Sequence, residues 1–316
     1  MRNFLMCSPE HFTHRVRNLR IASDIRVFVL VATASLVLAQ TGFAQPPKKP
    51  VVKQETLITE DKVEIKITYF KSNSGKDAAV VILLHGKGGN RLLYNKFAAE
   101  LQAKGDFAVI TVDLRGHGES SQAKKGDLKK ADFQAMASQD MDAVRDFIFD
   151  EHQREQLNMN KLGIVACDFS ASVALVYTAI DWEKEPYDDS PVASQRTPRG
   201  QDVQALALIS PDITTPGLFA NKAVTDVRAL PISFMIGASD KNNHDLASSR
   251  KLFDQISLKR EKDERLYFEK YPEAVKGMDL IIQDANLRAH IAAFLEKHVK
   301  GITSEWRDRR SRLERD

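Results

Sequence analysis

The chain has 316 residues, of which 43% are hydrophobic and 28% charged, a composition typical of a globular protein with one large core. Its formal net charge of +3 falls to zero without residues 1–44, which carry five arginines and two acidic residues. A nucleic-acid partner therefore has no electrostatic basis. Of the two cysteines, only Cys167 lies beyond residue 44, so an internal disulfide is excluded there.

The N-terminal residues resemble an export signal. Five arginines within the first 26 residues precede an uncharged apolar run over residues 27–39, and small residues follow at positions 42 and 44. The run is shorter than the roughly 20 residues that span a membrane. We therefore predict a signal peptide over residues 1–44 and a periplasmic or secreted protein. The alternative is an uncleaved anchor, with membrane contact only through residues 27–39.

Residues 45–54 begin with a proline-rich stretch, and we predict an extended linker there. One domain is expected over residues 55–300. It opens with two segments, 55–59 and 63–70, that alternate apolar and polar residues and predict an antiparallel hairpin with one buried face.

Continuous apolar runs and helical patterns then alternate along the chain. Such alternation predicts an α/β fold with a mostly parallel central sheet and helices on both faces. The runs expected as buried strands are 78–84, 108–113, 161–167, 205–211 and 231–237, with a last strand at 265–271. The segments with helical spacing are 91–104, 132–156, 170–182, 247–256 and 279–299.

Two polar segments fall outside this pattern. Glu183 to Gly200 contains three prolines and predicts a short lid insertion rather than a domain. Residues 301–316 form a charged C-terminal tail, which we expect to be solvated or frayed.

The strand at 161–167 runs directly into small residues and a helical pattern, the layout of a nucleophile elbow. Residues two before and two after the lifted position must be small. Lifting Asp168 satisfies this with Ala166 and Ser170, whereas lifting Ser170 places the bulky Asp168 at a flank. Asp168 is therefore the favoured position and Ser170 the alternative.

At this point the chain resembles the α/β-hydrolase family over roughly residues 55–300. The resemblance rests on His-Gly-Lys-Gly-Gly at 85–89, Asp-Leu-Arg-Gly-His-Gly-Glu-Ser at 113–120 and Gly-Ala-Ser-Asp at 237–240, each after a predicted strand. It implies that the triad acid is Asp240 and that His85, Gly86, Lys87 and Phe169 surround an oxyanion hole, with the N–H groups of Lys87 and Phe169 as donors.

The same resemblance implies a histidine in the loop after the last strand, where this chain has Lys276 instead. Branches of the family that use an Asp nucleophile, the haloalkane dehalogenases and epoxide hydrolases, still need a histidine to hydrolyse their ester intermediate. Lys276 beside Asp168 and Asp240 is expected to stay charged and form an ion-paired network rather than a proton relay. His244 is the displaced base that we consider.

We therefore expect an exported α/β-hydrolase homologue with a degenerate triad, which binds a small ligand or acts very slowly. The alternative is an active esterase-like or Asp-nucleophile hydrolase that uses Asp168 or Ser170 with a base such as His244. A third possibility is a cell-envelope interaction protein that uses the lid. No metal site or cofactor motif is visible in the sequence.

Overall fold

The computed structural model describes residues 51–121, 127–260 and 262–315. The predicted signal peptide lies outside these ranges. Within them, no helix combines the length and the apolar character that a membrane crossing requires.

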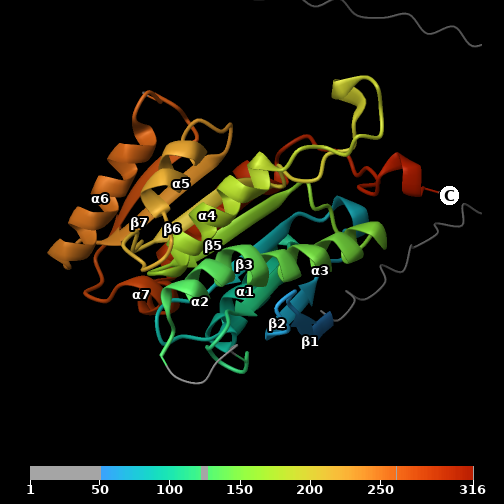
Figure 1. The fold of residues 1–316 in the computed structure, drawn as a ribbon. Helices are drawn as coiled ribbons and strands as arrows, with labels where there is room; N and C mark the ends of the chain where they lie inside the picture. Colours follow the sequence, from blue (N-terminus) through green and yellow to red (C-terminus); the bar gives the residue numbers. More distant parts are fainter. Residues whose placement is uncertain (1–50, 122–126, 261, 316) are drawn as a thin grey trace, which may run out of the picture. The chain divides into compact units, whose positions relative to one another are not determined.

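In the described residues, eight strands form a single sheet in the order β1-β2-β4-β3-β5-β6-β7-β8 (Figure 1). β1 and β2 form an antiparallel hairpin and β2 is antiparallel to β4, whereas every pair from β4 to β8 is parallel. The strands are β1 (Val51–Ile58), β2 (Glu64–Lys71), β3 (Val80–Leu84), β4 (Ala108–Asp113), β5 (Leu162–Cys167), β6 (Val203–Ile209), β7 (Ser233–Ser239) and β8 (Leu266–Tyr271).

The apolar runs form the predicted central strands, because each is covered on both faces. Every residue of β3, β4, β5 and β7 is buried. β1 differs from the prediction in two ways: it begins at Val51, within the predicted linker, and its side chains are exposed except for a half-buried Leu57. The expected buried face is therefore found on β2 but not on β1, because β1 is the edge strand.

Helices cover both faces of the sheet. α3, α4, α5 and α6 contribute to one hydrophobic cluster, and α1, α7 and α8 to the other. The helices are α1 (Asn95–Gly105), α2 (Lys130–Ala135), α3 (Met141–Gln153), α4 (Ser170–Glu183), α5 (Ala220–Val227), α6 (Asn243–Ser257), α7 (Gly277–Gln283) and α8 (Ala285–Leu295). Short 3-10 turns lie at Gly75–Asp77, Arg91–Tyr94, Ala193–Gln195 and Arg312–Glu314.

Two predicted helices are interrupted. A π-helical turn (Met136–Asp140) separates α2 from α3, and a second one (Glu296–Lys300) follows α8. The closing helix divides at Asp284, whose carboxylate accepts the N–H groups of Asn286 and Leu287 and so begins α8.

The predicted lid segment lies at the wrong edge of the sheet to cover the elbow. It follows the C-terminus of α4 and precedes the first residue of β6, so it belongs to the edge where the parallel strands begin. Figure 1 shows this loop (yellow) beside the C-terminal residues, at the opposite end of α4 from α7. The segment 183–200 is therefore a loop at the far edge of the sheet and not a lid over the elbow.

The C-terminal tail is docked rather than frayed. Trp306 Nε1 donates to the His152 carbonyl (2.9 Å), and Arg309 is only 3% exposed. The Arg309 guanidinium donates to the carbonyl of Gly200 (3.1 Å) and pairs with the buried Asp202 (2.7 Å). Sequence suggested a solvated end because the tail is highly charged, but its charge is used to neutralise a buried carboxylate.

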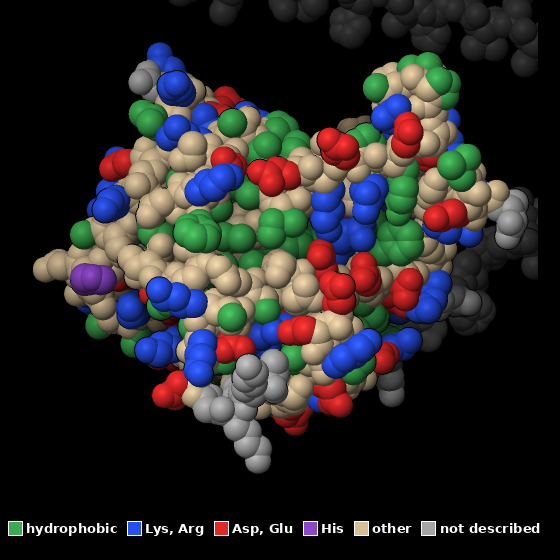
Figure 2. All heavy atoms as spheres, in the orientation of Figure 1, with side chains coloured by type: hydrophobic (Ala, Val, Ile, Leu, Met, Phe, Trp, Pro, Cys, Tyr) green, Lys and Arg blue, Asp and Glu red, His purple; other side chains and the backbone are tan. Residues whose placement is uncertain are grey.

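Charged side chains of both signs are interspersed over the face seen in Figure 2, with hydrophobic side chains in a band between them. This agrees with the near-zero net charge of the chain beyond residue 44.

Candidate functional site at the β5–α4 elbow

The turn between β5 and α4 lifts Asp168. Its φ of +49° is in the left-handed region, which a non-glycine residue adopts only when the surrounding structure enforces it. Ala166, two residues before it, is fully buried, and Ser170 begins α4. Asp168 therefore occupies the apex that the small flanking residues predict.

Two glycines enclose the Asp168 carboxylate. Gly86 follows β3, and Gly277 opens α7 with a φ of +59°. A Cβ atom at either position would overlap the carboxylate. Glycine is needed at both places because the backbone of the two loops packs directly against the lifted side chain.

The surroundings of Asp168 favour its neutral form. Burial raises the pKa of Asp168 to about 6, and the negative charges of Asp245 and Asp212 act in the same direction. The positive charge of Lys276 and the backbone N–H of Met278 oppose this rise. Among the described residues, no histidine forms a hydrogen bond with this carboxylate.

The three expected triad positions do not form an ion-paired network. Lys276 precedes α7 and is exposed, and it has no carboxylate within 4 Å among the described residues. Asp240 is also exposed, and its backbone N–H donates to the Tyr271 carbonyl (2.9 Å). The expectation of a salt-bridged pocket floor is therefore wrong, because two of its three members extend into solvent.

Neither alternate residue is placed for catalysis at the apex. Ser170 is fully buried, and its hydroxyl bonds within the fold, to the carbonyls of Cys167 (2.9 Å) and Leu84 (3.2 Å). His244 lies exposed in the first turn of α6, and its ring forms no hydrogen bond with another described residue. The elbow thus contains neither a lifted serine nor the displaced base that we considered.

The two backbone N–H groups expected to form the oxyanion hole are not hydrogen-bonded to other described groups. Neither the Lys87 N–H nor the Phe169 N–H has a hydrogen-bond acceptor in the part of the chain that the structure describes. His85 is buried beside them; its Nε2 accepts the Leu114 N–H (3.2 Å), so Nδ1 carries the proton and donates to the Gly86 carbonyl (2.9 Å). Burial lowers the pKa of His85 to about 4, which keeps it neutral. His85 therefore supports the backbone of this loop.

Sequence reasoning missed a second buried acid near the elbow. Asp245 is 2% exposed and accepts the Ser210 hydroxyl (2.9 Å) and the Ser239 N–H (2.8 Å). The Ser210 oxygen in turn accepts the Gly277 N–H (2.7 Å). Asp245 thus holds the α7 loop against Asp168 through Ser210. Its position five residues after Asp240 is the only signal in the sequence that could have indicated it.

His117, in the loop after β4, contacts the residue that follows the apex. Its half-buried ring stacks on Phe169, the residue after Asp168, with centroids 5.3 Å apart and planes 16° apart. Its Nδ1 lies 3.1 Å from the Arg115 carbonyl, whereas Nε2 has no partner among the described residues.

Two buried arginines fix two loops on the β3 side of the elbow. Arg91 pairs with Asp113 and Glu119. Arg115 pairs with Asp140 (2.8 Å) and Asp61 (2.7 Å). The loops after β3 and β4 are therefore held by charge pairs in which each guanidinium meets two carboxylates.

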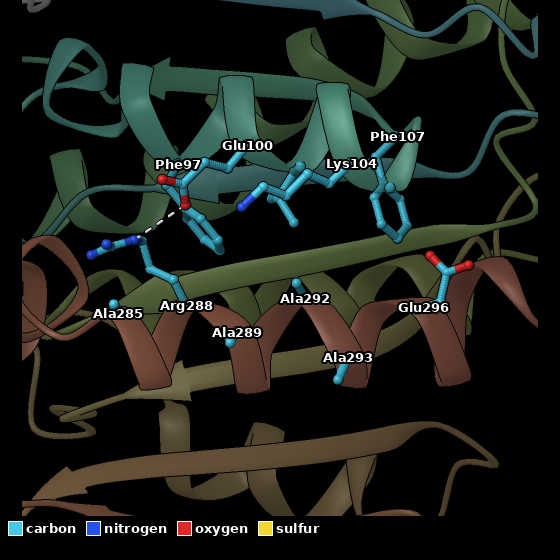
Figure 3. Close-up of a pocket in the computed structure, with 12 residues that line it drawn as sticks. Phe97, Glu100, Lys104, Phe107, Ala285, Arg288, Ala289, Ala292, Ala293 and Glu296 are labelled. Atoms are coloured by element: carbon cyan, nitrogen blue, oxygen red, sulfur yellow. Dashed lines mark hydrogen bonds and ion pairs between the residues drawn. The ribbon is translucent and has the colours of Figure 1, made fainter.

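A separate groove of about 430 Å³ lies between α1 and α8 (Figure 3). Four alanines of α8 form one wall, and Arg288 spans the groove to Glu100 (3.3 Å). None of the elbow residues lines it. The described residues also contain no group of three or more side chains that could hold a metal ion.

Comparisons with known proteins agree with this architecture. Residues 79–224 match a family model described as alpha/beta hydrolase fold. Two curated proteins match locally: protein phosphatase methylesterase 1 from Bos taurus and from Mus musculus are each 35% identical over 63 residues. That match covers 20% of this chain and 17% and 16%, respectively, of those proteins, well under two thirds of their length.

Solved structures match over most of the domain at low identity. An esterase from Pyrococcus furiosus aligns with a TM-score of 0.56 and 13% identity, covering 79% of this chain and 92% of that one. A fungal esterase from Rhizomucor miehei gives 0.58 and 13%, covering 80% and 85%. Dienelactone hydrolase from Anabaena variabilis gives 0.54 and 14%, covering 79% and 99%. At such low sequence identities the likeness establishes the fold alone. The chemistry has to be argued from the residues of the site.

Proposed function

Because this chain belongs to the α/β-hydrolase fold family, we propose that it keeps the family's site at the elbow as a small-ligand site and has lost efficient hydrolysis. The observation that carries the proposal is the lifted residue: a carboxylate enclosed by Gly86 and Gly277, with no histidine bonded to it among the described residues. Acyl transfer requires a nucleophile and a base that takes and returns its proton. Asp168 has neither an activating base nor a lifted hydroxyl beside it.

The same groups define the chemistry of the ligand. Asp168 offers a hydrogen-bond acceptor when ionised, and the N–H groups of Lys87 and Phe169 offer two donors. A small molecule with a hydroxyl or amine next to a carbonyl or carboxylate oxygen complements both. The pKa of Asp168 is raised to about 6, so this carboxylate becomes charged as the pH rises through that value. Ligand binding should strengthen over the same pH range, because a charged carboxylate is the stronger hydrogen-bond acceptor.

Turnover is tested on the purified protein with a panel of short-chain and methyl esters and a fluorophosphonate probe. Methyl esters are included because of the local likeness to a methylesterase. We expect no serine labelling and hydrolysis close to the background rate. Stoichiometric labelling of a serine together with rapid turnover would refute the proposal.

Binding is tested separately by thermal shift with small hydroxy acids and amino acids, because a ligand of the native state raises the midpoint of unfolding. Asp168→Asn should lose the shift produced by any hit, whereas His244→Ala, a change at an exposed residue, should keep it. Loss of the shift in His244→Ala with retention in Asp168→Asn would contradict the assignment of the site.

A second candidate function is hydrolysis through Asp168 as the nucleophile. Two features favour it: the positive φ of Asp168 at the apex, and the Lys87 and Phe169 N–H groups, which have no acceptor among the described residues. Both are features of the backbone at an active elbow. His117, whose ring stacks on Phe169 and whose Nε2 has no partner among the described residues, would then be the candidate base. This candidate predicts that Asp168→Asn abolishes a measurable activity that His244→Ala and Ser170→Ala leave in place, and that an ester of Asp168 is detectable by mass spectrometry in His117→Ala.

We extend the proposal to export, which the arginine-rich start and the apolar run at 27–39 support. N-terminal sequencing of the protein recovered from the cell envelope or medium should begin near residue 45. Recovery of the intact N-terminus from the membrane fraction would indicate an anchor, and recovery from the cytosol would refute export.

A further inference from the structure

We infer that the free edge of β1 is a self-association surface, on which β1 of a second copy of this chain pairs antiparallel about Gln54. The inference rests on the exposure of this strand, on the direction of its backbone groups and on the placement of its charges.

β1 lacks two of the features that keep natural edge strands from pairing, a β-bulge and a proline. Its eight residues pair with β2 without a register shift, and none of them is proline. All are exposed except the half-buried Leu57. In Figure 1 it forms the last strand of the sheet beside β2.

The hydrogen bonds of β2 fix which backbone groups of β1 point outward. The N–H of Glu64 donates to Ser121 Oγ (2.8 Å), and the N–H of Lys66 to Ser120 Oγ (2.8 Å). These even-numbered residues face β4, so the odd-numbered residues of β2 face β1. Thr59 and Val63 agree, because the N–H of Thr59 donates to the Val63 carbonyl across the hairpin.

β1 pairs odd residues with odd residues of β2, for example Val51 with Lys71. Its odd residues therefore bond to β2, and the N–H and C=O groups of Val52, Gln54, Thr56 and Ile58 point to the free edge. A second strand must bond to these even residues, with even residues of its own copy.

Because even residues must pair with even residues, one symmetric register of the two β1 strands is electrostatically favourable. Pairing centred on Lys53 places two Lys53 side chains opposite each other, and pairing centred on Glu55 opposes two Glu55 side chains. Pairing centred on Gln54 places Lys53 of each copy opposite Glu55 of the other, twice per dimer. These residues are exposed and have no ion-pair partner among the described residues. They would fall in non-hydrogen-bonded pairs, where opposing side chains approach most closely.

The opposite edge offers no such complementarity. β8 carries Glu269 and Lys270 at adjacent positions, one on each face of the strand. In a symmetric pairing, residues of equal parity oppose each other, so Glu269 never meets Lys270 of the second copy. The charge pattern therefore selects β1 and selects a second copy of this chain as its partner.

The test is sedimentation velocity over a range of micromolar concentrations, on the protein made from the full coding sequence. We expect a concentration-dependent dimer. Lys53→Glu and Glu55→Lys should each weaken it by about tenfold or more, because two attractive cross-strand pairs become repulsive. Lys270→Glu, an equivalent change on the other edge strand, should have no effect.

Two combinations separate this register from any other dimer. The double variant Lys53→Glu/Glu55→Lys should restore the dimer, and an equimolar mixture of the two single variants should form a heterodimer. Gln54→Pro should abolish association while the monomer keeps its thermal midpoint within a few degrees, because only an outward N–H is lost. A protein that stays monomeric at 100-fold the lowest concentration tested would overturn the inference, as would dimerisation that all three single β1 variants leave unchanged.

Discussion

The buried carboxylates beside the elbow and the one on the elbow are stabilised in different ways. Asp113 and Asp140 are inaccessible to solvent, and each meets the guanidinium of a buried arginine, Arg91 or Arg115. Asp168 is enclosed by two glycines, and the cation that acts on it among the described residues is the exposed Lys276. Asp113 and Asp140 are thus neutralised by buried arginines, whereas Asp168 has no cation in direct contact among the described residues.

The difference teaches that the loops around Asp168 are held firmly although, among the described residues, no histidine forms a hydrogen bond with this carboxylate. The loops after β3 and β4 are still fixed by charge pairs, and the α7 loop is fixed by Asp245 through Ser210. A rigid frame around a half-buried carboxylate is consistent with the ligand site that we propose there.

The largest expected effect is from breaking a paired carboxylate. Arg115→Met should lower the free energy of unfolding by about 3–5 kcal/mol, because Asp140 is left buried without its countercharge. Urea denaturation measures the change. Arg250→Met, in an exposed pair with Asp254, is the control and should cost about 0.5 kcal/mol or less. Equal losses in the two variants would show that burial does not distinguish the pairs.

Arg309→Met should cost about 2 kcal/mol, less than the loss of Arg115, because Asp202 retains Arg145 at 3.8 Å. The tail should also become accessible to protease beyond residue 301. A tail that remains protected in this variant would indicate that the Trp306 and backbone contacts suffice to dock it.

Gly277→Ala tests how closely the α7 loop encloses the apex. Backbone strain at a φ of +59° and overlap with Asp168 should together cost about 1–3 kcal/mol. Gly88→Ala is a matched control, because Gly88 also has a positive φ (+71°) but open space around its Cβ position. The free energies of unfolding of the two variants, measured in urea, should differ by the cost of the overlap with Asp168. Equal values would show that the α7 loop shifts to relieve the overlap at no cost.

The smallest expected effect is the pH dependence that comes from Asp168. Its pKa of about 6 lies above the ordinary 3.8, so the folded state binds more protons than the unfolded state between these values. Stability from this group should therefore fall by about 1–2 kcal/mol as pH rises from 4 to 6, less than the full linkage because the side chain is partly exposed. Asp168→Asn should remove this component when urea unfolding is repeated across the range. An unchanged pH profile would contradict the raised pKa.

The sequence by itself determined the architecture and the position of the elbow. Short continuous apolar runs that alternate with helical patterns are typical of strands that helices cover on both faces, so their order predicted the sheet. The small residues around Asp168 predicted which side chain is lifted, because larger ones cannot enter so tight a turn. These are local constraints, and a local pattern records them.

Only the tertiary structure decided which charges meet. Lys276 and Asp240, which we expected at triad positions, extend into solvent, whereas Arg309, in a tail that we expected to be frayed, is buried against Asp202. Asp245 reaches the elbow through Ser210, although 35 residues separate the two in the chain. An ion pair depends on where distant segments converge and on how much water they exclude, and neither quantity is encoded in the spacing of residues along the chain.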